Sequence, residues 1–196
     1  MKLIVGLGNP GQSYARNRHN AGFMCISRFA RDHRIPFERK KSNARIGQGV
    51  VDTVPVILAR PQTYMNASGK AVGGLLRAFK LAIDDLIVVH DDLDLPLARI
   101  RVRKGGSSGG HNAVQSIIRD AGSADFVRVR IGIGRPPRSD NPEFSEQDVV
   151  DYVLADFTSS EQEAIDRIIP TVSEALQCIL SEGFVSAMNR FNPRPE

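Results

Sequence analysis

Short apolar runs rich in β-branched residues alternate along this chain with longer amphipathic stretches. Four of these runs are flanked by glycines or prolines and predict strands, over 2–7, 54–59, 85–90 and 126–134. A fifth run, 44–51, shows less of this pattern and is a further strand candidate. Such runs favour strands because branched side chains pack well on a pleated surface.

The stretches between the runs place apolar residues at helical spacing. They predict helices over 20–33, 67–80, 111–120 and 160–182. We expect Asn20 to cap the first helix, and Asn66 or Ser68 to cap the second. Pro170 should kink or split the longest helix, because proline lacks the N–H group that the helix needs. The alternation of strands and helices indicates an α/β fold with a largely parallel central sheet.

Length and turn-forming residues favour one domain over 1–196. A chain of 196 residues, 41% of them hydrophobic, can build one sizeable core and only marginally two. The most obvious loop is 135–145, which is rich in proline. Because too little chain follows it for a second core, we expect a mobile surface loop there and no domain boundary.

Composition suggests a soluble cytoplasmic protein with a polyanionic partner. The net charge is +4, a mild excess that suits such a partner without proving one. Cys25 and Cys178 lie far apart in apolar helical surroundings, so buried free thiols are expected, with neither a disulfide nor a zinc site. The first apolar run is too short for a signal peptide, and none approaches the ~20 residues of a membrane span.

The segment GLGNPG matches the dinucleotide-binding pattern G-x-G-x-x-G at Gly6, Gly8 and Gly11. In dinucleotide-binding folds the third glycine opens a helix whose N-terminus meets the pyrophosphate. Here Pro10 stiffens the turn, residues 12–18 show no amphipathic period, and no acidic residue ends a second strand at the required distance. A nucleotide cofactor is therefore not expected.

The segment GGSSGG matches the nucleophile pattern G-x-S-x-G at Ser107 and again at Ser108. An α/β-hydrolase triad runs serine, acid, histidine along the chain, and no histidine follows a later strand. The order therefore excludes that triad. Two interpretations stay open: a tight turn alone, or a turn whose N–H groups hold an anion together with the helix that follows.

Polar side chains follow the ends of the predicted strands, where open α/β sheets bind ligands. They are Asn9, Asn66, Asp91, Asp92, Asp94, His111 and Asn112, with His19 and Asn20 ahead of the first helix. Each has a structural explanation, since asparagine is common in turns and caps. Together, amides that polarise a carbonyl and a histidine–aspartate pair favour a peptide-like or ester substrate. The acidic cluster can alternatively bind Mg²⁺.

Arginines alternate along two predicted strands. Arg99, Arg101 and Arg103 share one face of the first, and Arg128 and Arg130 repeat the pattern on the second. A charged strand face is usually only solvated, but five arginines without an acidic residue among them favour phosphate contacts. Aromatic residues are few and do not interleave with the arginines, so we expect contacts to a nucleic-acid backbone and no stacking on bases.

The motifs of this chain occur together in one known family. They are KLIVGLGNPGQSYARNRHNAG, QTYMNASGKAV, DDLDLP, GGSSGGHNAVQSII, RVRIGIGRP and AMNRFN. In this collinear order they resemble bacterial peptidyl-tRNA hydrolase over nearly the whole chain. The resemblance implies a mixed, mostly parallel twisted sheet surrounded by helices. It also implies a monomeric esterase, without metal or other cofactor, that cuts peptide from the 3′ ribose oxygen of tRNA.

Position by position, the resemblance places the family's catalytic histidine at His19 and its supporting aspartate at Asp91. The residues it implies for substrate binding are Asn9, Tyr14, Met65, Asn66 and Asn112. Those it implies for tRNA binding are Arg101, Arg103 and Arg130. In this assignment His19 is a general base that deprotonates water, and Asp91 orients the ring and stabilises the imidazolium.

The chain departs from the family pattern at a few positions. Asn17 stands where threonine is usual, Ser107 and Ser108 fill a loop usually richer in glycine and histidine, and Ala113 replaces a glycine. Arginines replace lysines in the basic strip, which keeps the charge and changes the phosphate geometry. These changes flank the implied site and remove no group with a chemical role, so they bear on substrate affinity more than on activity.

Two other functions stay open at this point. One is a non-catalytic RNA-binding module, because this fold has RNA-binding relatives without hydrolase activity. The other is a Mg²⁺-dependent phosphodiesterase that uses the acidic cluster. The intact set of implied site residues argues against the first, and the absence of a phosphate-loop lysine pattern argues against the second. Neither DNA nor a membrane is expected as a partner.

Overall fold

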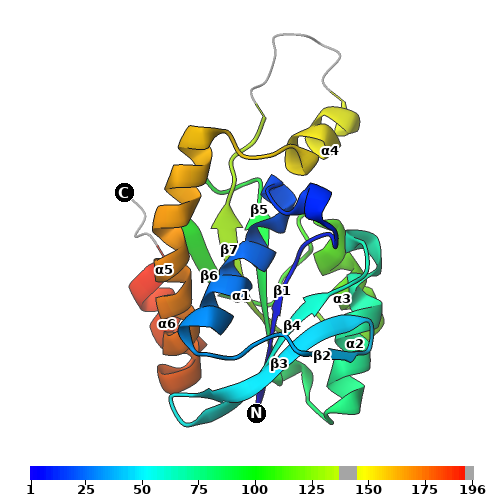
Figure 1. Ribbon diagram of the computed structural model, residues 1–196, viewed down its shortest axis with the longest axis vertical. Coiled ribbons are helices and arrows are strands. Elements are labelled where there is room, and N and C mark those ends of the chain that lie inside the picture. Colours follow the sequence, from blue (N-terminus) through cyan, green and yellow to red (C-terminus); the bar gives the residue numbers. More distant parts are fainter. Residues whose placement is uncertain (137–144, 193–196) are drawn as a thin grey trace.

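The computed structural model describes residues 1–136 and 145–192. Within them, seven strands form one sheet in the order β2-β3-β4-β1-β5-β7-β6 (Figure 1). The strands are β1 (Lys2–Gly6), β2 (Arg39–Lys41), β3 (Ala44–Val51), β4 (Val54–Pro61), β5 (Leu86–Asp92), β6 (Ile100–Lys104) and β7 (Val127–Gly132). The four central strands β4, β1, β5 and β7 are parallel, and antiparallel pairing adds the others. The predicted mixed α/β sheet is confirmed.

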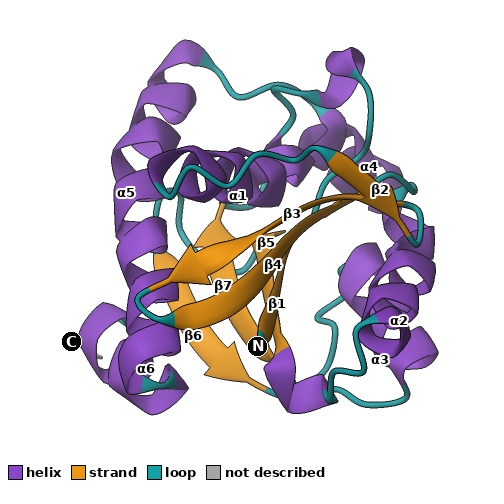
Figure 2. Cartoon of the chain, turned by 60° about the horizontal axis from the view of Figure 1, so that its bottom comes forward, coloured by secondary structure: helices purple, strands orange, loops and turns teal. Residues whose placement is uncertain are grey.

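Helices cover both faces of this sheet (Figure 2). One face carries α1 (Ala21–Asp32), α5 (Ser159–Glu182) and α6 (Phe184–Phe191), and the other carries α2 (Ser68–Ala78) and α3 (Asn112–Ala121). Side chains alternate along each strand, so Ile4 of β1 joins the first core while Leu3 and Val5 join the second. The helix α4 (Glu146–Leu154) lies beyond the carboxyl ends of the central strands (Figure 1).

The elements predicted from the hydrophobic pattern are confirmed with small shifts at their ends. The pattern did not predict β2, α4 or α6. Of the two outcomes predicted at Pro170, the split is wrong, because α5 continues through that residue, and the kink stays a prediction. Buried Ile169 and Val172, on either side of the proline, hold the helix against the core where a backbone hydrogen bond is lost. Within the described residues, no helix is both long and apolar enough to span a membrane.

Asn20 occupies the predicted N-cap position of α1, but none of the predicted caps makes a capping hydrogen bond. Asn20 precedes α1, but its side chain does not cap that helix and instead pairs with the backbone of Asn9. Ala67 precedes α2, and neither Asn66 nor Ser68 supplies a capping hydrogen bond. In both cases a tertiary contact or helix packing outweighs the local preference. Most of the predicted loop 135–145 lies outside the described residues, which resume at 145.

The start of α1 lies very close to the ends of two central strands. A Cβ atom on Gly22 would lie 2.4 Å from the carbonyl oxygen of Val89 and 2.6 Å from the backbone nitrogen of Leu7. Only glycine therefore permits this approach of the helix backbone to β1 and β5. The contact fixes the residues that immediately precede α1 against the carboxyl edge of the sheet.

Candidate active site

A cavity of about 590 Å³ opens at the carboxyl edge of the sheet. Its polar wall comes from the ends of β5 and β7, the segment before α1 and the start of α3, and includes His19, His90, Asp91, Asp92, His111 and Asn112. Val149, Val150 and Val153 of α4 form an apolar wall. The cavity therefore joins ionisable groups to an apolar surface, as ligand sites commonly do.

His19 and Asp91 form a hydrogen bond at the base of this cavity. His19 lies in the short 3-10 helix Arg18–Asn20, and its Nδ1 is 2.8 Å from Oδ2 of Asp91, which lies near the end of β5. An ionised carboxylate can only accept, so the histidine donates its Nδ1 proton. In a neutral ring Nε2 is then unprotonated, and it makes no hydrogen bond to the described residues. His19 can therefore accept a proton through Nε2.

Buried polar contacts of its neighbours Arg18 and Asn17 hold the segment that carries His19 in place. Arg18 donates to Glu161 Oε2 over 2.7 Å and to the carbonyl of Tyr152 over 3.2 Å. Its neighbour Asn17, where the sequence departs from the family pattern, donates to Asp156 Oδ1 over 2.9 Å. These contacts tie the segment before α1 to α4 and to the N-terminus of α5.

His111 contacts the other oxygen of the same carboxylate. Its Nε2 lies 2.9 Å from Asp91 Oδ1, and its Nδ1 accepts from the backbone N–H of Val114 at the start of α3. These two contacts indicate the tautomer protonated on Nε2. The rings of His19 and His111 are 4.9 Å apart. One buried carboxylate thus accepts a hydrogen bond from each of two imidazoles.

The contact between His19 and Asp91 shifts the pKa of both groups. Burial alone lowers the pKa of His19, but the charge of Asp91 and its hydrogen bond raise it, and the net pKa lies above the ordinary 6.5. Burial alone raises the pKa of Asp91, but the two imidazoles hold it well below its usual range. Asp91 therefore stays ionised and stabilises a proton on His19.

His90, the residue before Asp91, is fully buried in the wall of the cavity. Its Nδ1 donates to the carbonyl of Asp91 over 2.6 Å, and its Nε2 has no partner among the described residues. Burial and the nearby His111 lower the pKa of His90 to about 3. This third imidazole is therefore neutral at ordinary pH and adds no charge to the site.

Asn9 connects two of the loops at the carboxyl edge. Its side-chain Oδ1 accepts from the backbone N–H of Met65 over 3.2 Å, while its own backbone pairs with the amide of Asn20. Asn9 and Met65 are both buried. Through these contacts the loops after β1 and β4 lie against the segment that carries His19.

The remaining residues implied for substrate binding are more exposed. Asn112 begins α3 and lines the cavity, whereas Asn66 is exposed and does not line it. Tyr14 lies edge-on to Tyr64 with ring centroids 6.4 Å apart, also outside the cavity wall. The structure therefore places His19, Asp91 and Asn112 around one cavity, with Tyr14 and Asn66 outside its wall and Asn9 and Met65 buried.

The arginines of β6 and β7 do not all present a free charge. Arg101 and Arg103 are exposed on β6, and Arg103 lines the cavity. Arg130 lines it too, but it pairs with Asp92. Arg128 is buried and donates to the carbonyls of Gly106 and Ser107. The prediction that Arg128 contacts phosphate is therefore not supported, because the glycine-rich loop occupies its donors.

The family model described as peptidyl-tRNA hydrolase matches residues 3–196. The chain belongs to this family. A curated peptidyl-tRNA hydrolase from Dehalococcoides mccartyi is 52% identical to it, over 98% of this chain and 100% of the relative. Another, from Chloroflexus aurantiacus, is 44% identical over the same shares. The resemblance predicted from the motifs is confirmed.

Solved structures agree with this family assignment. The crystal structure of peptidyl-tRNA hydrolase from Acinetobacter baumannii matches the chain with a TM-score of 0.90 and 35% identity, over 98% of this chain and 94% of that one. A peptidyl-tRNA hydrolase in complex with N-propanol also has a TM-score of 0.90, at 34% identity, over 100% and 97% of the two chains. The fold of this family member is therefore the fold of those hydrolases.

Among the residues that the structure describes, one group of side chains can hold a metal ion, and it lies at this site. Donor atoms of His19, Asp91 and His111 all lie within 4.8 Å of one another. A metal there would replace the hydrogen bonds that join the three. The acidic cluster weighed for Mg²⁺ does not converge, because Asp92 pairs with Arg130 and Asp94 with Arg135. The carboxylates considered as an alternative Mg²⁺ site are therefore divided, Asp91 between two histidines and Asp92 and Asp94 between two arginines.

Sequence reasoning assigned no site role to His111 or His90 and did not recognise Arg18 as an anchor. His111 is adjacent to the implied Asn112 and was expected at the same strand end, but no local pattern indicates which side chain it meets. Asp91 is 20 residues away along the chain. The position of His111 directly after a glycine-rich turn was the signal available.

Proposed function

We propose that this chain hydrolyses the ester bond of peptidyl-tRNA, with His19 as general base and Asp91 as its supporting carboxylate. The proposal is carried by one observation, the 2.8 Å contact between His19 Nδ1 and Asp91 Oδ2. That contact orients the ring, leaves Nε2 as the proton acceptor, and stabilises the charge that the ring gains. The identity of the substrate, peptidyl-tRNA, is inferred from membership of the peptidyl-tRNA hydrolase family.

The reaction needs no group beyond the side chains of the cavity and one water molecule. His19 Nε2 removes a proton from water while the water oxygen forms a bond to the carbonyl carbon of the ester. The tetrahedral intermediate then expels the 3′ ribose oxygen, and the imidazolium returns its proton to that oxygen. The products are a peptide with a free carboxylate and a tRNA with a free 3′ hydroxyl.

The other implied residues are proposed to hold the two halves of the substrate. Asn9, Asn66 and Asn112 offer amides that can bind and polarise peptide carbonyls, and Met65 and Tyr14 offer apolar surface to the peptide. Support comes from the position of Asn112 on the cavity wall and from the contact that joins Asn9 to Met65. Arg101, Arg103 and Arg130 are proposed to contact tRNA phosphates.

We also propose that 1–196 is one domain that acts as a cytoplasmic monomer without a metal or other cofactor. The match of the family model to 3–196 supports a single domain. Cys25 and Cys178 are both free and buried, which suits a reducing compartment. Sedimentation equilibrium of the purified protein tests the monomeric state.

Release of tRNA from N-acetyl-aminoacyl-tRNA tests the activity and the base. We expect turnover by the wild type, and a loss of about 10²–10⁴-fold in H19A with tRNA binding retained. H33A is the matched control, because His33 packs on Phe29 and does not line the cavity. Undiminished turnover by H19A would refute the role of His19.

The same assay separates the two rival functions. Salt-sensitive tRNA binding without turnover by the wild type would identify a non-catalytic RNA-binding protein. Turnover that disappears with EDTA and returns with Mg²⁺ would identify metal-dependent chemistry and remove His19 as the sole activator of water. Turnover unchanged by EDTA supports the proposed mechanism.

A further inference from the structure

Three basic side chains lie directly opposite one another across β2, β3 and β4. Lys40 pairs in register with Arg45, and Arg45 pairs in register with Arg60. Cross-strand partners project from the same face of a sheet, and neighbouring strands are about 4.8 Å apart. The three residues, called the basic ladder below, therefore form a row of cations on the face that carries α1.

No acidic side chain in the described part of the chain forms an ion pair with the basic ladder. Glu38, the acidic residue nearest to Lys40 along the chain, pairs with none of them. Like charges placed directly opposite destabilise a sheet. The arrangement is therefore a cost to the fold that a bound anion would relieve.

Protection of the sheet edge explains only part of the basic ladder. Exposed cations on an edge strand prevent pairing with other chains, and this accounts for Lys40 on β2. It does not account for Arg45 and Arg60, because β3 and β4 are interior strands. Edge protection therefore leaves Arg45 and Arg60 unexplained.

Arg60 is held in place and is not a freely moving surface side chain. Its guanidinium lies 4.4 Å from the centroid of the Phe37 ring and donates to Ser27 Oγ over 3.2 Å. Burial, together with the charge of Arg45, lowers the pKa of Arg60. The basic ladder thus has one anchored member and two exposed members, which can meet an extended polyanion with little further ordering.

The basic ladder also lies at the functional edge of the sheet. Arg60 is the penultimate residue of β4, and β4 is parallel to β1 and β5, so it shares the edge that carries Asp91. The loop that follows β4 leads to Met65. The exposed arginines of β6 lie at the opposite end of the strand order. Basic groups therefore lie toward both ends of the strand order, the basic ladder on the face that carries α1 and the arginines of β6 on the opposite face.

We propose that Lys40, Arg45 and Arg60 form a second phosphate-binding surface, which contacts the RNA backbone of the substrate on the side of the cavity away from β6. This inference rests on the proposed function, which supplies an RNA ligand. Three guanidinium or ammonium groups in a row match a chain of phosphates, and no aromatic side chain lies in register with them for base stacking. The contact is therefore independent of nucleotide sequence.

Binding of unacylated tRNA at a series of salt concentrations tests the proposal. The variant K40Q/R45Q removes the two exposed charges and leaves the anchored Arg60 in place. Each phosphate contact contributes roughly 0.7–0.9 to the slope of log affinity against log salt. We expect the slope to fall by about 1.4–1.8 in the double variant, and KM for N-acetyl-aminoacyl-tRNA to rise while kcat is unchanged.

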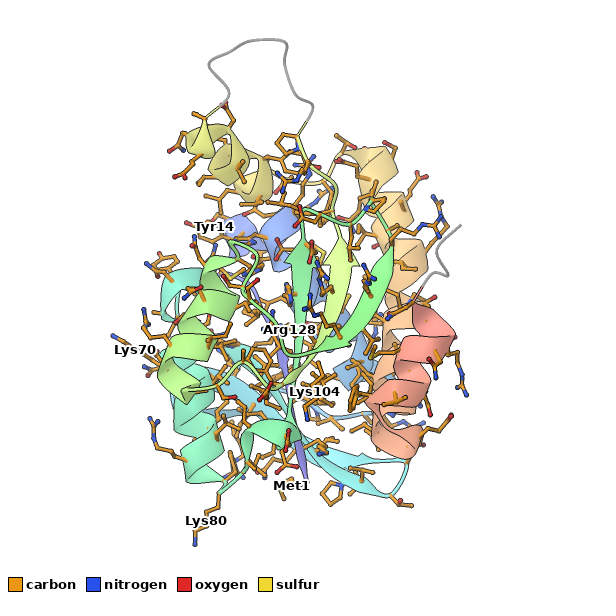
Figure 3. The ribbon with its side chains drawn as sticks, turned by 180° about the vertical axis from the view of Figure 1, so that it is seen from behind. Met1, Tyr14, Lys70, Lys80, Lys104 and Arg128 are labelled. Carbon is orange, nitrogen blue, oxygen red and sulfur yellow. The ribbon has the colours of Figure 1, made fainter. Side chains whose placement is uncertain are left out.

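The matched control is K80Q/R167Q, which removes the same net charge elsewhere. Lys80 lies at the far end of the molecule from Tyr14 (Figure 3), and Arg167 is exposed on α5. An unchanged slope in K40Q/R45Q would overturn the proposal, as would an equal fall in the control. Urea unfolding checks that the ladder variant is folded, and removal of adjacent like charges should not destabilise it.

A polyglutamate peptide serves as the other polyanion in the same binding assay. If K40Q/R45Q loses affinity for the peptide but binds tRNA as the wild type does, the surface binds acidic protein and the RNA proposal fails. Because the ligand is unacylated and the readout is binding, this outcome does not depend on turnover. Failure of the hydrolysis assay and failure of the basic ladder are therefore distinguishable.

Discussion

His111 donates its Nε2 proton to Asp91 Oδ1 over 2.9 Å, on the oxygen that His19 leaves free. A carboxylate bound through one oxygen can rotate, and rotation would release the ring of His19. With both oxygens engaged and buried, the carboxylate has one orientation. We infer that His111 is a positioning residue, which acts on the reaction through Asp91.

Two substitutions of His111 separate its contact with Asp91 from its contact with α3. In H111Q the side-chain amide can still reach Asp91, while H111N keeps a favoured helix cap but is too short to reach the carboxylate. We expect H111Q to retain most of kcat. H111N should lose about 10–100-fold, the effect of one hydrogen bond to a charged group. Steady-state hydrolysis of N-acetyl-aminoacyl-tRNA measures both.

Urea unfolding of the two variants provides the control for this prediction. If His111 serves only to cap α3, H111N should be the more stable and also the more active of the two. That order of activities would contradict the positioning role. A fall in kcat with unchanged KM in H111N supports it.

Replacement of Asp91 by asparagine should move the acidic limb of the pH–rate profile to lower pH. The carboxylate raises the pKa of His19 against the lowering effect of burial, so its removal lets the pKa fall. His19 must be neutral to act as a base, and activity is lost as pH falls through its pKa. We expect D91N also to lower kcat, because the imidazolium loses its counter-charge.

The profile of kcat/KM against pH checks this prediction. D84N is the control, because Asp84 lies away from the cavity and pairs with Lys104. An acidic limb at the same pH in D91N and the wild type would mean that the limb reports a group other than His19. The assignment of His19 as the base would then lose its main support.

Much of the fold follows from local patterns, because four central strands and four helices each carry a clear period. The elements that were missed have no such signal. β2 consists of three exposed cations, and its pairing with β3 depends on the turn between them. α4 contributes only one buried residue, Val153, and its valines face a cavity that local sequence does not indicate.

The candidate site, like the fold, could be predicted from the sequence only in part. The ends of parallel strands meet at one edge, so the sequence indicates that His19 and Asp91 lie near each other. Which oxygen meets which nitrogen depends on the approach of α1 at Gly22 and on the turn before His111. Arg128 and Arg130 occupy equivalent positions in the alternating pattern, and only the folded structure shows that Arg128 donates to the glycine-rich loop whereas Arg130 pairs with Asp92.

His90 should make the stability of the protein depend on pH. Its pKa is about 3 in the folded state, against an ordinary value of 6.5, so the folded protein binds fewer protons than the unfolded chain. This contribution is fully present above pH 6.5 and is lost as pH falls toward 3. Over that range, we expect protonation of His90 to lower the free energy of unfolding by about 1.4 kcal/mol for each unit of pH.

The variant H90N keeps a side-chain donor for the carbonyl of Asp91 and cannot titrate. Urea unfolding at several pH values should show a smaller dependence on pH in H90N than in the wild type. His19 acts in the opposite sense, since its raised pKa favours the fold at low pH and its contribution is lost as pH rises through the folded pKa. A dependence equal to that of the wild type, with H33N as the reference, would contradict the role of His90.

Arg128 is expected to support the glycine-rich loop and not the RNA. Its two terminal nitrogens donate to the carbonyls of Gly106 and Ser107 over 2.5 and 2.6 Å, and the side chain is buried. A lysine ammonium keeps the charge but cannot span both carbonyls. R128K should therefore lower the free energy of unfolding by about 1–3 kcal/mol, the cost of a buried acceptor without its donor.

The effect of R128K on function should follow from the loop, because this loop ends at His111. We expect kcat to fall as the contact between His111 and Asp91 loosens, while the dependence of tRNA affinity on salt stays that of the wild type. R103K is the matched control, since Arg103 is exposed and its replacement should leave stability unchanged. The opposite result, a stable R128K with weaker and less salt-dependent tRNA binding, would make Arg128 a phosphate ligand. It would then restore the prediction that the alternating arginines first suggested.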